Sequence, residues 1–505
     1  MKLFSSSQVR EIDKLTIENE PVISINLMER ASMKFTQWFT GKFDTSYPVV
    51  VFAGSGNNGG DALAISRILI GRQYQVRVYL LPTGSFLSPD CAINLERLKA
   101  YTNPIILDSG SLSDFPTIDP EAIVIDGIFG SGLNRPVEGW IADIIRNINT
   151  NARMVVSIDI PSGLFGEDNR GNNLENIIKA NHTVSFEFPF LSFFMSGNEL
   201  FTGTWEVVPI GLHKESIENT DTSYVTIDAQ GIRNLLIPRK KFSHKGTYGH
   251  ALVIAGRTGM MGAAVLAAKA CLRGGAGLTT VCVPASGMDI LQVAAPEALT
   301  LTRRSDAFFD EVPDLSIYQT IACGPAIGTS AETAAALHKL IVTAKMPLVL
   351  DADALTLLSE HKEWLEQLPP GSVITPHPKE FDRLAGATAD MYSRHLKQLE
   401  FAKKYKILVV LKGANTIVST GEGKSYINTT GNPGMATGGT GDVLTGLVTS
   451  LIAQGYRSLD AALIGVFIHG LAGDIALETS STESLIAGDL IDNFGRAFLQ
   501  IKGHG

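Results

Sequence analysis

Short apolar runs alternate with helical patterns along most of the chain. In the first half, the apolar runs are rich in β-branched residues and lie at residues 48–53, 75–81, 122–126, 154–159 and 183–188. A rhythm of strand, helix and strand is typical of a parallel sheet that is covered by helices on both faces. Residues 7–39 show helical spacing of apolar side chains, and we expect this segment to pack on the sheet.

A second series of strands and helices follows a polar, β-poor segment at residues 214–223, which we interpret as a linker. Its apolar runs lie at residues 250–255, 278–284, 320–323, 347–351, 372–375 and 406–411, with helices expected at 262–274 and 331–344. The pattern predicts an α/β protein of two tandem three-layer αβα domains, over residues 1–215 and 224–505.

Composition and charge exclude several classes of protein. The net charge of −9 leaves no basic excess for nucleic acid or for an anionic membrane, so we expect neither partner. The four cysteines lack paired metal spacing and lie in apolar or helical surroundings, which indicates buried thiols in a reducing compartment. The first residues lack a signal-peptide pattern, and we expect no membrane-spanning stretch and a cytoplasmic location.

A glycine-rich turn at residues 432–442 leads into a segment whose apolar side chains recur at helical spacing. Small residues let backbone N–H groups approach an anion, and a helix that begins at about Gly441 adds its positive dipole end. Asp442 lies in the first turn of that helix, where it would repel phosphates unless it accepts a proton from an attacking hydroxyl. This turn therefore predicts phosphoryl transfer.

Other polar clusters follow the predicted strands of the second half. They lie at residues 323–328, 351–353, 375–380 and 412–416. Ligands gather at the carboxyl ends of strands in open α/β sheets, so we expect these clusters to share one crevice. Glu380 is a candidate for holding a water of Mg²⁺, and His377 is a candidate substrate contact.

Three polar segments also follow strands of the first half, at residues 54–61, 126–133 and 159–164. The first of them has the position of a phosphate loop but matches neither a P-loop nor a dinucleotide fingerprint. Asn58, Asp126 and Ser162 offer oxygen ligands with one formal charge, which suits a hard monovalent cation.

The second half resembles the dehydratase domain of NAD(P)H-hydrate repair enzymes, which has a ribokinase-like fold. The motifs that carry the resemblance lie at residues 245–249, 253–256, 259–264, 351–354, 375–380 and 432–442. The resemblance implies nucleotide-dependent dehydration of the S hydrate of NADH or NADPH, with ADP in bacterial-type members and ATP in eukaryotic ones. It implies that Ala263, Gly324, His377 and Asp442 contact the hydrate. It implies that the nucleotide is held by Lys412, Gly413, Ala414, Asn415, Thr416 and Gly441.

A kinase-like fold suits this reaction because hydroxide is a poor leaving group. Transfer of a phosphoryl group to the ring hydroxyl, with Asp442 taking the proton, would create a good leaving group whose departure restores the dihydronicotinamide. We expect Mg²⁺ and ADP, or ATP in its place, at this domain.

The first half resembles the epimerase domain that precedes the dehydratase domain in many bacterial repair enzymes, and we expect it to be Rossmann-like. The resemblance implies K⁺ at Asn58, Asp126 and Ser162, and Asp159 is our candidate acid/base group. The residues that would bind the hydrate are Asn57, Asn58, Gly59, Gly60, Asp61, Gly130, Ser131, Gly132, Leu133, Asn134, Arg135, Pro136 and Asp159. An Asp159 that only caps the turn before Pro161 is the alternative.

These observations favour a bifunctional metabolite repair enzyme, an isomerase and a lyase in one chain, which we expect to be a homo-oligomer. A ribokinase-type kinase of a small alcohol, with the first half as a regulatory ligand domain, is the second hypothesis. A third hypothesis makes the first half an RNA-associated binding module, against which the acidic composition counts.

Overall fold

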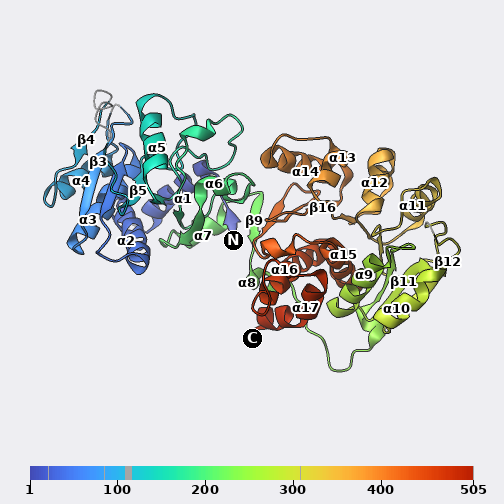
Figure 1. The fold of residues 1–505 in the computed structure, drawn as a ribbon. Coiled ribbons are helices and arrows are strands. Elements are labelled where there is room, and N and C mark those ends of the chain that lie inside the picture. The colour runs from blue at the N-terminus through green and yellow to red at the C-terminus, as the bar shows by residue number, and fades with distance from the viewer. Residues whose placement is uncertain (21, 85, 109–115, 307–308, 504–505) are drawn as a thin grey trace. The chain divides into compact units, whose positions relative to one another are not determined.

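The computed structural model describes the whole chain except residues 21, 85, 109–115, 307–308 and 504–505. The described residues form two compact units, one of residues 2–222 and one of residues 223–505, which also includes Met1. Each unit is a sheet with helices on both faces (Figure 1). The prediction of two tandem αβα units in an α/β fold is therefore confirmed.

The first unit contains a parallel sheet with the strand order β4-β3-β2-β5-β6-β7-β8. Its elements are β1 (Lys2–Leu3), α1 (Ser6–Asn19), α2 (Ser24–Lys42), β2 (Val49–Ala53), α3 (Asn57–Gly71), β3 (Val76–Leu80), α4 (Pro89–Lys99), β4 (Ile105–Ile106), β5 (Ile123–Gly127), α5 (Gly139–Asn151), β6 (Met154–Ile158), β7 (His182–Phe186), α6 (Glu199–Thr202), β8 (Thr204–Val208) and α7 (Lys214–Asn219). The strand order reverses on either side of β2, as in Rossmann-like folds, and such a switch point is where ligands bind.

Alternate side chains of the central strand β2 supply two separate cores. Val51 packs with Phe35 of α2 on one face of the sheet, and Phe52 packs with Ile145 of α5 on the other. A strand that is buried on both faces must be apolar throughout. This requirement explains why β2, β5 and β6 could be predicted from continuous apolar runs.

The second unit has the strand order β9-β18-β17-β16-β15-β14-β13-β10-β11-β12, in which β17 runs antiparallel to both of its neighbours. Its elements are β9 (Tyr224–Ile227), α8 (Ala229–Leu235), β10 (His250–Ile254), α9 (Met261–Gly274), β11 (Leu278–Pro284), α10 (Met288–Ala294), β12 (Leu299–Arg303), β13 (Thr320–Cys323), α11 (Ala331–Thr343), β14 (Leu348–Leu350), α12 (Asp353–Glu360), β15 (Val373–Ile374), α13 (Pro378–Ala385), α14 (Met391–Tyr405), β16 (Leu408–Leu411), β17 (Ile417–Ser419), β18 (Ser425–Asn428), α15 (Thr440–Ala453), α16 (Ser458–Ala476) and α17 (Ala487–Lys502).

Helices α9 and α15 approach each other closely because Gly446 lies where they cross. A Cβ atom at this position would come 2.2 Å from the carbonyl oxygen of Ala267. The helix α15 begins at Thr440, next to the predicted start at Gly441, and its apolar side chains from Val443 to Ile452 are buried. This packing holds the amino-terminal end of α15 against the sheet.

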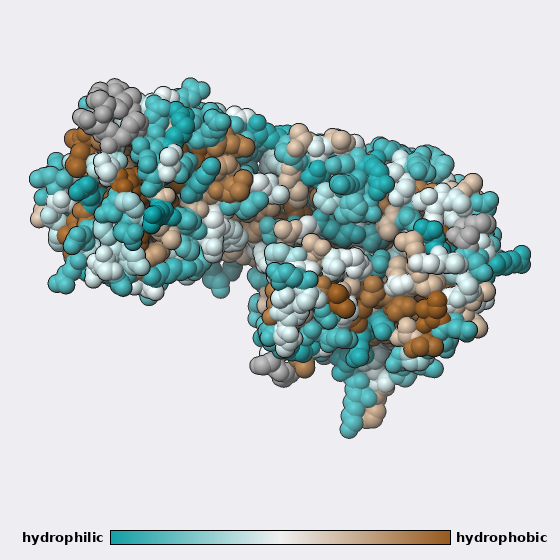
Figure 2. Space-filling model, in the orientation of Figure 1, coloured by the Kyte–Doolittle hydropathy of each residue, from teal (hydrophilic) through white to brown (hydrophobic). Residues whose placement is uncertain are grey.

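We expected no uncharged apolar stretch of membrane-spanning length, and helix α16, the one described helix that is long and apolar enough to cross a membrane, contains Asp460 and Asp474. It is 19 residues long, and 72% of its apolar window is buried inside the protein. Its side chains belong to the main core of the second unit. Hydrophilic side chains predominate on the face of the molecule that Figure 2 shows.

Several elements were not predicted. Strands β4 and β8 at or near the edges of the first sheet, and β9, β12, β17 and β18 in the second, lack the long apolar runs of the central strands. Lys214–Asn219 of the segment that we interpreted as a linker forms helix α7. The Lys2 ammonium donates to the carbonyl oxygens of Glu218 (2.7 Å) and Thr220 (2.8 Å), so a distant side chain satisfies the end of this polar helix.

Candidate active sites

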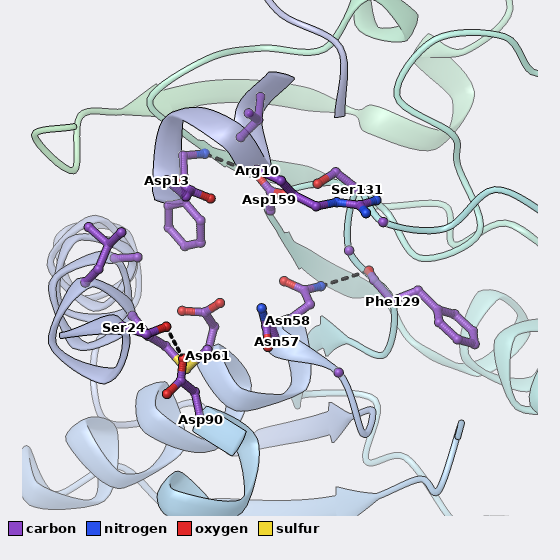
Figure 3. A pocket seen from close by; sticks show the side chains of 18 of the residues that line it. Arg10, Asp13, Ser24, Asn57, Asn58, Asp61, Asp90, Phe129, Ser131 and Asp159 are labelled. Carbon is purple, nitrogen blue, oxygen red and sulfur yellow. Dashed lines mark hydrogen bonds between the residues drawn. The ribbon is translucent and has the colours of Figure 1, made fainter. Parts of the chain in front are cut away.

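A cavity of about 720 Å³ lies in the first unit, at the carboxyl ends of β2, β5 and β6 (Figure 3). The predicted hydrate-binding residues that line it are Asn57, Asn58, Asp61, Gly130, Ser131, Gly132, Leu133 and Asp159. Asn134, Arg135 and Pro136 lie beyond its lining. Residues from three of the polar segments that follow strands in the sequence therefore line this one cavity.

Gly59 and Gly60 lie in the first turn of α3 and do not line the cavity. A Cβ atom at Gly59 would come 1.9 Å from the carbonyl oxygen of Gly54, and one at Gly60 would come 2.9 Å from the sulfur of Met28. Close packing therefore accounts for both glycines.

Asn58, Asp126 and Ser162 surround the backbone of Phe129 beside the cavity. The Asn58 amide donates to the Phe129 carbonyl (2.8 Å), and the Phe129 N–H donates to the Ser162 hydroxyl (2.8 Å). The buried Asp126 carboxylate accepts hydrogen bonds from the hydroxyl of Ser157 (2.8 Å) and from the N–H of Ser162 (2.9 Å). The three residues predicted to hold a cation are thus brought together.

Asp159 lies at the end of β6 with a φ of +64°. Residues other than glycine, asparagine and aspartate rarely adopt this backbone conformation. Its carboxyl accepts weak hydrogen bonds from the N–H of Phe186 (3.4 Å) and from the hydroxyl of Ser185 (3.5 Å). Burial raises the pKa of Asp159 to about 6, and the hydrogen bonds partly oppose that rise. A carboxyl with this pKa can serve as acid or base near neutral pH.

Helix α1 contributes cavity residues that the sequence did not reveal. Arg10, Asp13 and Lys14 line the cavity, and Figure 3 shows Asp13 pointing into it. Burial and the charges of Asp159 and Glu187 raise the pKa of Asp13 to about 7. A polar helix face is ordinarily solvated, so only the tertiary structure identifies this one as part of a cavity.

Four adjacent strands of the second unit end in the predicted functional groups. Gly324 follows β13, Asp351 follows β14, His377 follows β15, and Lys412 follows β16. Parallel neighbours place their carboxyl ends at one edge of a sheet, so these groups share that edge. Gly324 has a φ of +141°, and a Cβ atom there would come 1.9 Å from the carbonyl oxygen of Asp351.

A partly buried ion pair lies at the amino-terminal end of α15. The Lys412 ammonium is 2.8 Å from the Asp351 carboxylate, whose other oxygen accepts from the Thr445 hydroxyl (2.9 Å). A Cβ atom at Gly441 would come 3.1 Å from the Lys412 nitrogen, so glycine lets the helix approach the cation. Asp351 therefore holds the positively charged Lys412 ammonium at the end of the helix, where an anion would bind.

Asp442 lies beside this ion pair in the first turn of α15. Burial raises its pKa to about 6, the charge of Asp351 adds to that rise, and the charge of Lys412 opposes it. The partly buried His469 donates from its Nε2 to the carbonyl of Thr440 (2.9 Å) and so anchors the start of the helix. Neither His469 nor Thr445 could be identified from the sequence, because both belong to apolar helices.

The remaining predicted residues of this site lie in its loops. His377 caps α13, with its ring nitrogen accepting from the N–H of Lys379 (3.1 Å), and Glu380 accepts from the N–H of His377 (2.8 Å). One carboxylate oxygen of the Mg²⁺ candidate Glu380 is thus used in a capping interaction. The loop of Lys412, Gly413, Ala414, Asn415 and Thr416 connects β16 to β17, and Ala263 is partly buried in the first turn of α9.

Comparison with known proteins gives matches to both units. Residues 24–191 match a family described as YjeF-related protein N-terminus, and residues 251–495 match the NAD(P)H-hydrate dehydratase family. The chain is 33% identical to the bifunctional NAD(P)H-hydrate repair enzyme Nnr of Moorella thermoacetica, over 97% of this chain and 96% of that protein. It is 33% identical to the protein of the same name from Thermofilum pendens, over 99% and 97%.

One solved structure that resembles the second unit is the ADP/ATP-dependent NAD(P)H-hydrate dehydratase of Bacillus subtilis, co-crystallized with ATP/Mg²⁺. It is 29% identical, covers 55% of this chain and 98% of its own, and has a TM-score of 0.47.

Proposed function

Because the chain belongs to the family of bifunctional NAD(P)H-hydrate repair enzymes, we propose that it returns hydrated NADH and NADPH to the usable cofactors. The first domain, residues 1–215, interconverts the R and S hydrates. The second domain, residues 224–505, dehydrates the S hydrate at the expense of a nucleotide. Both reactions act on one pool of substrate, which explains why the two domains are fused.

The observation that carries the dehydratase assignment is the group of Asp442, Lys412 and Asp351 at the start of α15. A base that is ionised at neutral pH lies beside a cation and a helix end that favour phosphate. We infer that the nucleotide lies over Gly441 and residues 412–416. Ala263, Gly324 and His377 would then contact the hydrate.

In the proposed reaction, Asp442 takes the proton of the ring hydroxyl as that oxygen attacks the terminal phosphorus of ADP. The bond from that phosphorus to the bridging oxygen breaks, AMP leaves, and the ring carries a phosphate ester. The ester departs as inorganic phosphate with its bonding electrons, and loss of a proton from the neighbouring carbon restores the double bond. Glu380 would help to hold Mg²⁺, and a bound Mg²⁺ would neutralise charge on the transferred group.

Epimerisation is assigned to the cavity of the first unit, where Asp159 is the proposed acid/base group. Asn57, Asp61 and the segment from Gly130 to Leu133 would bind the hydrate. The Asp159 carboxyl lines the cavity and accepts hydrogen bonds from Ser185 and Phe186 of β7, which supports this role over that of a cap on the turn before Pro161.

The oxygen atoms around Phe129 fit a hard monovalent cation, since one carboxylate is combined with neutral amide, hydroxyl and carbonyl groups. We propose that Asn58, Asp126 and Ser162 hold K⁺ there. Dialysis into tetramethylammonium buffer should lower the epimerisation rate, and K⁺ should restore it better than Na⁺. A rate that is unchanged without K⁺ would contradict the site.

The main test is turnover of the separated hydrates by the full chain with ADP and Mg²⁺. The S hydrate should recover the near-ultraviolet absorbance of reduced nicotinamide and release AMP and phosphate in equal amounts. A parallel reaction with ATP identifies the preferred nucleotide. A stable phosphorylated product without recovered absorbance would instead favour a small-molecule kinase.

A further inference from the structure

The helix α1 presents a polar face to the cavity of the first unit, and no role has yet been given to it. Arg10, Asp13 and Lys14 come from successive turns of this face and line the cavity. The Arg10 guanidinium reaches the Gly130–Leu133 segment, since a Cβ atom at Gly132 would come 3.4 Å from it. Substrate in the cavity would therefore meet side chains of α1.

The Asp13 carboxyl has no hydrogen-bond or ion-pair partner within the part of the chain that the structure describes. Asp159 lines the same cavity, and the charges of Asp159, Glu187 and Asp61 are all near enough to act on Asp13. The Glu187 carboxylate is held by the N–H groups of Ile210 (2.8 Å) and Gly211 (2.9 Å). Asp13 is thus a free carboxyl next to a fixed negative charge.

Asp61 is less suited than Asp13 to exchange protons with a ligand. Its side chain is only 9% exposed, and it accepts a hydrogen bond from the buried Ser32 hydroxyl (3.1 Å). Asp13 is only partly buried and points into the open cavity (Figure 3). Asp90 also lines the cavity, but it is 9% exposed and its carboxylate accepts a hydrogen bond from the Ser24 hydroxyl (2.5 Å). Among the carboxyls that line the cavity, Asp13 and Asp159 are therefore the most available to a bound molecule.

On the basis of the epimerase activity proposed above, we propose that Asp13 and Asp159 are paired proton-transfer groups that invert the hydrated carbon from its two faces. The protonated carboxyl gives its proton to the ring hydroxyl, and the carbon–oxygen bond breaks as the ring nitrogen supplies electrons. Water leaves, and a water molecule adds to the opposite face while the other carboxylate takes its proton. One water leaves and one enters, and the two carboxyls exchange protonation states.

This exchange suits a reaction that runs in both directions. The final state of the pair after conversion of R to S is the starting state for conversion of S to R. The pKa values of about 7 for Asp13 and about 6 for Asp159 mean that one proton is shared by the pair near neutral pH. The other charged groups near the pair in the described part of the chain are Arg10 and Lys14 on α1, Asp61 on α3, Asp90 on α4 and Glu187 after β7.

The test compares Asp13→Asn with Glu18→Gln, which makes the same change from acid to amide on the exposed side of α1. Interconversion of the hydrates is followed by chromatographic separation of the two epimers, in ordinary water and in ¹⁸O-labelled water. We expect Asp13→Asn to slow epimerisation about 100-fold, within the range typical of a lost proton-transfer group. Glu18→Gln should match the native chain, and both variants should dehydrate the S hydrate at the native rate.

Three further measurements separate proton transfer from a structural role. In the native chain, kcat/KM for epimerisation should fall below pH 6 and above pH 7, and Asp13→Asn should lose the alkaline fall. Asp13→Glu should keep that fall at a reduced rate. Each inversion should introduce one ¹⁸O atom into the product.

Stability gives an independent check on the same variant. A carboxyl whose pKa is raised by folding costs stability once the pH passes its unfolded value of 3.8, and the full cost is reached above pH 7. Asp13→Asn should therefore raise the Tm of the first unit at pH 8, whereas a structural role would lower it.

The outcomes distinguish the inference from the function on which it rests. A native chain that does not interconvert the hydrates overturns the epimerase activity itself. A native chain that does so, together with an Asp13→Asn variant of unchanged rate and pH profile, overturns only the role of Asp13. Product without ¹⁸O would contradict loss and return of water.

Discussion

The two candidate sites each contain an aspartate with a pKa near 6, but different surroundings produce that value. Around Asp159, burial is the dominant cause, and hydrogen bonds oppose it. Around Asp442, burial is joined by the charge of Asp351 and opposed by the charge of Lys412. The pKa of Asp159 is therefore set by burial and hydrogen bonds, whereas that of Asp442 also depends on the charges of a neighbouring ion pair.

The difference matches the chemistry proposed for each unit. A carboxyl whose pKa is set mainly by burial keeps that pKa when a neutral hydroxylated ring enters the site. At Asp442 burial is also the largest cause, but the neighbouring charges of Asp351 and Lys412 act on the pKa as well, so this pKa should respond to the phosphates of a nucleotide. Similar pKa values therefore predict different responses to substitution.

The largest expected effect is the loss of dehydration in Asp442→Asn. Removal of the base should lower the rate by about 1,000-fold, within the usual range for general base catalysis. Recovery of near-ultraviolet absorbance from the S hydrate with ADP measures this rate. Epimerisation by the same sample is the control, and a variant that keeps the full dehydration rate would contradict the mechanism.

Asp159→Asn should slow epimerisation by about 100-fold while dehydration of the S hydrate continues. Asparagine tolerates the positive φ of this position, so the backbone should be preserved. Separation of the R and S hydrates measures the rate, and Tm measures folding. If Asp159 only capped the turn before Pro161, the variant would keep its epimerisation rate.

The next effect concerns the pH dependence of dehydration. Because Asp442 must be ionised to act as a base, kcat/KM should fall about tenfold per pH unit below pH 6. Lys412→Met removes the charge that holds this pKa down, so the fall should begin at a higher pH. The KM for ADP should also rise, by about tenfold for one lost charged contact.

Lys412→Arg is the matched control for this prediction, because it keeps the positive charge. Its pH profile should resemble that of the native chain. If the profile of Lys412→Met did not move, the ion pair would have no influence on Asp442.

The smallest effect is on the stability of one unit alone. Gly446→Ala places a Cβ atom 2.2 Å from the backbone oxygen of Ala267, and overpacking of this kind should cost about 1–3 kcal/mol. Calorimetry should show a lower Tm for the second unit while epimerisation remains. The control is Gly495→Ala on helix α17, where a Cβ atom would meet no atom within 4 Å. This substitution should be neutral or stabilising by up to about 1 kcal/mol. A shift of both transitions with Gly446→Ala would contradict independent units.

The central elements were predicted well because buried strands and helices carry characteristic patterns of apolar side chains. Strand β11 was predicted with the observed bounds of Leu278–Pro284, and the apolar stripe from Val443 identified α15. The polar helix α7 was missed because its end is satisfied by Lys2, more than two hundred residues earlier. The site residues remain predictions, although most of those expected in the first unit line one cavity.

The amino-acid sequence alone determined the two αβα units, the polar groups at the strand ends and the family, because periodic burial and local turns are encoded over short stretches. Only the tertiary structure decided which of these groups face one another. Asp351 and Lys412 are separated by 61 positions, and Asp13 reaches Asp159 from a different element of the first unit. The charge that each carboxyl experiences depends on such distant neighbours, and no local pattern carries that information.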